Sequence, residues 1–293
     1  MKKCLSRNRG VMLLELLIAS SAGLVVLLGV AYFITSTSLL FAKNVSTNLS
    51  HNSLRSSLDK MVQAVNLANG AVTLVNTTGG TVSDGTAAAG LLFDQFLGSP
   101  YVVTHPGGTG LSATATSVTL TRSTNASAAP PIPQAGDVIL LTDEETTRLK
   151  VQSVAAGTID STTLRQTLTV TLQSAIGTAL SWDATTLKTA ALVRKVAFVV
   201  LPNGTRNELR YFNNAEAITN FSNSNAYSLV TNNIGTDSAD VTPFTKSTIS
   251  GRALISIVLR VRAGQYANRL STKEANSFST IERVNLLLTP KAN

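Results

Sequence analysis

The feature that most constrains this chain is an uncharged apolar run close to its N-terminus. Residues 16–34 read LLIASSAGLVVLLGVAYFI, nineteen residues without a charge. At a rise of about 1.5 Å per residue, a helix of this run matches the roughly 30 Å hydrocarbon core of a bilayer. Because a cluster of Lys and Arg lies just before the run, the positive-inside rule places the N-terminus in the cytoplasm and the chain after Lys43 outside. The sequence therefore predicts a single-pass helix with its N-terminus inside.

The composition argues against a cytosolic enzyme. Charged residues make up 14% of the chain and aromatic residues 5%, and small polar residues dominate after residue 70, which favours exposed β structure. With two histidines and a single cysteine, Cys4, the sequence offers no zinc-ligand spacing, no cysteine nucleophile and no convincing serine triad. We therefore expect no catalysis, no cofactor and no metal.

Six residues, GVMLLE at positions 10–15, separate the basic start from the apolar run. A glycine, four apolar residues and a carboxylate in this order resemble the type III signal of type IV prepilins. In that family, prepilin peptidase cuts after the glycine and methylates the new N-terminus, and the glutamate is fifth in the mature chain. The resemblance implies cleavage between Gly10 and Val11. It also implies loss of a leader that holds four of the 24 basic residues, leaving 20 against 16 acidic residues, a net charge of +4.

Glu15 is also notable on physical grounds. A carboxylate at the start of an apolar helix is costly in lipid and needs a partner. When subunits stack by their helices, the N-terminal amine of a neighbour offsets this cost and sets the axial register. Two alternatives stay open: a secretory signal peptide cleaved near Ala19 to Ala22, and a plain membrane anchor in which Glu15 is solvated at the interface.

The periodicity after the apolar run predicts that the helix continues to about Asn69 and Gly70, followed by a β-rich region. We divide the chain into a leader (1–10), a helix (11–69) that inserts in the membrane to about residue 41 and is amphipathic beyond it, and an exported β-rich domain (70–293). The fold class is α+β: a long N-terminal helix packed on a mainly antiparallel sheet, as in pilins.

Several strands can be predicted from the alternation of apolar and polar residues. Residues 164–173 and 252–262 alternate cleanly, with Leu164 on the apolar face of the first. Residues 193–201 and 284–288 are nearly continuous apolar runs, which predict central strands. A strand, an acidic turn and a second strand over 135–157 are similar to the W-type minor pilins and the J-type minor pseudopilins of type II secretion.

The sequence thus predicts a structural subunit, a minor type IV pilin or type II secretion pseudopilin, that helps initiate or cap a filament. Its expected partners are prepilin peptidase, the bacterial inner membrane before assembly, and other pilin or pseudopilin subunits in a periplasmic or cell-surface filament. The alternative is a DNA-binding minor pilin of a competence or uptake system, because basic residues gather near the C-terminus. The candidate nucleic-acid face is Arg252, Arg260 and Arg262.

Overall fold

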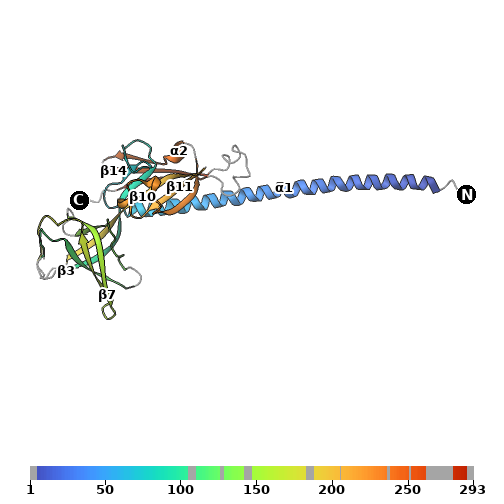
Figure 1. Ribbon diagram of the computed structural model, residues 1–293. Helices are drawn as coiled ribbons and strands as arrows, with labels where there is room; N and C mark the ends of the chain where they lie inside the picture. Colours follow the sequence, from blue (N-terminus) through green and yellow to red (C-terminus); the bar gives the residue numbers. More distant parts are fainter. Residues whose placement is uncertain are drawn as a thin grey trace.

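The fold is one long helix followed by a large antiparallel β structure, which confirms the predicted α+β class. The computed structural model describes residues 5–104, 110–125, 129–141, 147–182, 188–204, 206–235, 238–250, 252–261 and 280–288. Helix α1 projects from one side of the β-rich part, and its N-terminal end lies far from the rest of the chain (Figure 1).

Helix α1 spans Leu5–Asn66, 62 residues without a break, and is about 90 Å long at the usual rise per residue. No proline occurs before Pro100, and Gly23 and Gly29 do not interrupt the helix. Hydroxyl groups in the apolar half hydrogen-bond within the helix itself: the Ser20 hydroxyl donates to the Leu17 carbonyl at 3.0 Å, and Thr35 donates to the carbonyls one turn earlier. Gly70, with a φ of 98°, lies shortly after the helix ends.

Thirteen strands form one sheet within the described residues, and two short strands, β4 and β9, pair separately. The short helical segments are η1 (Ala215–Ala217), η2 (Phe221–Asn223) and α2 (Ser238–Val241). The strands, in chain order, are β1 (Thr73–Val75), β2 (Thr81–Val82), β3 (Gly90–Thr104), β4 (Gly110–Leu111), β5 (Ser117–Ser123), β6 (Val138–Leu141), β7 (Arg148–Asp160), β8 (Arg165–Leu172), β9 (Leu180–Ser181), β10 (Lys188–Asn203), β11 (Arg206–Phe212), β12 (Ser228–Ile234), β13 (Phe244–Ile249), β14 (Arg252–Val261) and β15 (Thr280–Leu288).

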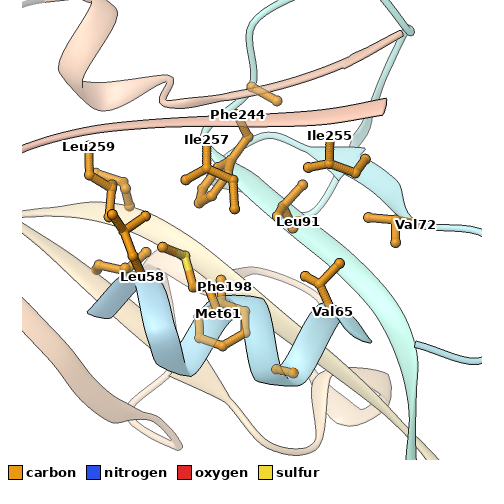
Figure 2. Close-up of a cluster of buried hydrophobic side chains, with 14 of the residues drawn as sticks. Leu58, Met61, Val65, Val72, Leu91, Phe198, Phe244, Ile255, Ile257 and Leu259 are labelled. Carbon is orange, nitrogen blue, oxygen red and sulfur yellow. The ribbon is translucent and has the colours of Figure 1, made fainter. Parts of the chain in front are cut away.

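The first of two lobes, the helix lobe, is a sheet that curls around the C-terminal half of α1. It contains β1, β2, β11 to β15, the first half of β3 and the second half of β10. The two sides of this curved sheet nearly meet, because Ala88, just before β3, forms a β-bridge with Phe244 at the start of β13. The helix contributes Leu54, Leu58, Met61, Ala64 and Val65 to the buried core, facing Phe198 of β10 and Ile257 of β14 among others (Figure 2).

The second lobe, the barrel lobe, is a closed antiparallel barrel. Going round it, the order is β10, β6, β7, β8, β5 and β3, and β3 pairs back to β10. Its interior is filled by its own side chains, as in other small barrels, with the β4–β9 pair contributing Leu111 and Leu180. This core shares no buried residue with the core around α1. Region 70–293 therefore comprises two separately packed lobes joined through β3 and β10.

Most of the predicted strands are confirmed. In β8, Leu168, Val170 and Leu172 are buried while the threonines between them face outward, and β10 is buried on both faces from Val196 to Leu201. Two expectations are wrong. Leu164 lies in the turn before β8 with a φ of 52° and is exposed, and β15 pairs only with β14 in the described structure, which makes it an edge strand.

Candidate functional site: the projecting helix

The N-terminal half of α1, from Leu13 on, is not covered by any other part of the chain that the structure describes. Every described side chain from Leu13 to Thr35 is exposed, and large apolar residues such as Leu27 and Phe33 have 70% and 68% of their surface open. Burying a side chain of this size stabilises by about 1.5 to 3 kcal/mol, so this length of open apolar helix is strongly unfavourable in water. Water is therefore an unfavourable environment for this half of the helix.

The uncovered segment suits a membrane by length and composition. It belongs to the one helix among the described residues that is long and apolar enough to cross a bilayer. The helix first becomes buried at Ser50 and then at Leu54, while Phe41 and Leu49 are still exposed. The nine helical steps from Phe41 to Ser50 correspond to about 13 Å of helix between the apolar segment and the lobe.

The three residues that the prepilin resemblance singles out all lie on α1. Gly10 and Val11 are part of its first turns, so the backbone is helical on both sides of the predicted cut. Glu15 is exposed, two turns of helix or fewer from that position, and lies between the exposed residues Leu14 and Leu16. Within the described part of the chain, no cation forms an ion pair with Glu15. Its carboxylate is thus free to meet a group from another molecule.

The candidate nucleic-acid residues do not gather into one patch where they are described. Arg252 is exposed at the start of β14, beside the hairpin turn that follows β13. Arg260 lies eight residues further along the same strand, about 27 Å away. The Arg260 Nε atom is 3.5 Å from a carboxylate oxygen of Asp240, whose side chain is buried. Arg262 lies outside the described residues.

Compared with known proteins, the chain matches no protein-family model, no curated protein and no solved structure. Interpretation therefore depends on the order of features along the chain and on their geometry. A long apolar N-terminal helix, exposed in its first half and packed in its second half on an antiparallel β-rich region, is consistent with a pilin-like architecture.

Proposed function

We propose that this chain is a noncatalytic filament subunit of the type IV pilin class, either a minor pilin or a type II secretion pseudopilin. The observation that carries the proposal is the uncovered apolar half of α1, with Glu15 at its start. A membrane anchor alone explains the apolar surface but gives the carboxylate no role. A helix that first lies in lipid and then packs against neighbouring helices accounts for both.

The proposed order of membrane insertion, cleavage and assembly follows from these properties. Before assembly it spans the inner membrane once, N-terminus in, with its β-rich lobes on the far side. Prepilin peptidase cuts after Gly10, and the new amine of Val11 pairs with Glu15 of an adjacent subunit in the filament. Lipid and then neighbouring helices cover the apolar side chains, so the helix moves between two apolar environments.

The bulk of the β-rich part supports a minor rather than a major subunit. Of the two lobes, only the helix lobe packs on α1, and the core of the barrel lobe includes no residue of this helix. A second lobe on every subunit is difficult to repeat along a tightly packed filament. A subunit present in few copies, which initiates or caps a pilus or pseudopilus, has no such restriction.

The test replaces Glu15 with Leu in cells that contain the processing enzyme and the partner subunits. Glu15→Leu makes the helix more apolar, so insertion and cleavage after Gly10 should persist. A neighbour's amine, however, loses its partner in a dry interface, at a cost of roughly 3 to 5 kcal/mol. Crosslinking to partner subunits and cofractionation with filaments should therefore fall.

The matched control is Ser20→Leu, which makes the same helix more apolar and leaves the carboxylate in place. Ser20 is exposed and hydrogen-bonds only within the helix. We expect this variant to be processed and incorporated as wild type. If Glu15→Leu is processed and enters filaments equally well, the amine–carboxylate contact is refuted. This conclusion also requires normal crosslinking to the subunit below. A subunit at the tip has no neighbour above it, so normal entry into filaments would not by itself test the contact there.

A further inference from the structure

The two lobes are joined by a waist, the stretch in which β3 and β10 run from one lobe into the other and exchange their outer strand partners. On β10, pairing with β6 stops at Val193 and pairing with β11 starts at Ala197. On β3, pairing with β1 stops at Leu92 and pairing with β5 starts at Val102. The chain just after α1 also pairs with β3, since the Phe96 amide donates to the Leu67 carbonyl at 2.8 Å. The segment 67–69 ends beside Phe96, and β6 begins beside Val193, which pairs with Phe96, so β3 and β10 are the described strands that continue from one lobe into the other.

This waist has the features of a bendable joint. The β3–β10 register shifts between Ala190 and Val193, opposite Gly98, and Pro100 follows on β3. Bulges bend strands locally and increase their twist. Because the two lobes have separate cores, a change of angle at the waist exposes neither core.

On one face of the waist, a buried ion pair joins β10 to the chain just before β6, next to the last β10–β6 pair, Val193 and Val138. Arg194 of β10 donates two hydrogen bonds to Asp137, just before β6, at 2.6 Å and 2.8 Å. The Asp137 side chain is fully buried, and it also accepts the Gln134 amide at 2.7 Å. A two-pronged pair of this kind fixes direction as well as distance.

On the other face, the side chains of Asp94 and Lys195 are cross-strand neighbours and take part in a second set of ion pairs. Arg148 of β7 pairs with Asp94, and Glu216 of η1 pairs with both Lys150 of β7 and Lys195, the latter at 2.5 Å. These side chains line a notch of about 170 Å³ between the lobes. They are partly exposed, 48% for the Arg148 side chain and 25% for that of Glu216, so salt screens them much more than the buried pair.

We propose that the waist is a hinge held in one position by these ion pairs, and that releasing them changes the angle of the barrel lobe relative to α1. The buried Arg194–Asp137 pair, which holds the waist stretch of β10 against the barrel lobe, is the main lock. The notch pairs, which include Glu216 of η1 with Lys150 of β7, are a weaker, salt-sensitive brace. This inference does not depend on the filament proposal, because it concerns only contacts within one chain. In any assembly that holds α1, the hinge decides where the barrel surface points.

The experiment measures the distance between the lobes in the full chain in detergent micelles by pulsed electron paramagnetic resonance. Spin labels are placed on Ser56→Cys of α1 and Thr169→Cys of β8, both exposed, with Cys4→Ser to remove the native thiol. We expect one narrow distance distribution for the parent chain. Asp137→Asn should at least double its width or add a second distance.

A double variant, Asp94→Asn with Glu216→Gln, should broaden the distribution less than Asp137→Asn does. Salt at 1 M, where the screening length is about 3 Å, should reproduce that smaller effect in the parent chain. The matched control is Asp84→Asn, which removes a pair with Lys246 at 3.1 Å within the helix lobe and should leave the distribution unchanged.

Circular dichroism and Trp182 fluorescence establish that each labelled variant is folded. If Asp137→Asn does not fold, the double variant and the salt series decide the question. A folded Asp137→Asn chain with the parent distribution overturns the hinge. So does equal broadening in Asp84→Asn, because the effect would then not belong to the waist.

Discussion

The packing of α1 in the helix lobe gives a sharp prediction from two leucines of the same helix. Leu54 is fully buried in the core around α1, whereas Leu49, five residues earlier, has 61% of its surface exposed. Leucine to alanine removes three carbon atoms, worth about 0.8 kcal/mol each when buried, and an unfilled cavity adds to this loss. We expect Leu54→Ala to lower the free energy of unfolding by about 2 to 5 kcal/mol. Leu49→Ala should change it by no more than about 0.5 kcal/mol.

The assay is urea unfolding of the full chain in detergent, followed by far-ultraviolet circular dichroism in the β region. With a slope near 2.5 kcal/mol per molar urea, the Leu54→Ala midpoint should fall by roughly 0.8 to 2 M. The Leu49→Ala midpoint should stay close to that of the parent. Equal shifts for the two variants would refute the boundary between the projecting and the packed halves of α1.

Three further predictions concern the β-rich part. Gly90→Ala should destabilise the helix lobe by about 1 to 3 kcal/mol in the same urea assay, because the added Cβ would lie 2.8 Å from the Phe198 carbonyl oxygen. Partial burial acts to raise the pKa of Glu216, but its two lysine partners outweigh this and hold the pKa below its ordinary value of 4.5. The carboxylate therefore stabilises the fold above that pH, and the free energy of unfolding should fall more steeply between pH 6 and pH 3 in the parent than in Glu216→Gln. In a fluorescence-anisotropy titration at physiological salt, the full chain should not bind duplex DNA with micromolar affinity; binding that is lost on Arg252→Ala or Arg260→Ala would favour the uptake alternative.

Local patterns were sufficient to predict the helix and several strands. In β8 one face meets the barrel core and the other meets water, so Leu168 and Val170 alternate with threonines in the sequence itself. Strand β10 is covered on both faces, which the continuous apolar run of residues 196–201 reflects. The same rule misplaced Leu164, because alternation does not mark where a turn begins. The residue that indicates the turn is Asp160, whose side chain accepts a hydrogen bond from the Thr162 amide at 2.8 Å.

The barrel and its waist could not be predicted, because they depend on pairings distant in sequence. Leu192 pairs with Gly98, and Arg194 meets Asp137 across 57 residues. No local pattern specifies which strands close a barrel, and an isolated arginine and aspartate in a sequence usually lie on the surface. The candidate residues Gly10, Val11 and Glu15 were identified by their order alone, and the fold adds that all three lie on α1 and that Glu15 is exposed.

The central claim, that this chain is processed and assembled as a pilin-like subunit, is tested most directly by the mass of the mature protein. The protein is extracted from the membranes of cells that contain prepilin peptidase, and its intact mass and N-terminal peptide are measured. The proposal predicts a chain that begins at Val11 with a methylated amine and lacks Cys4. A chain that still begins at Met1, or one that begins after Ala22, would contradict it.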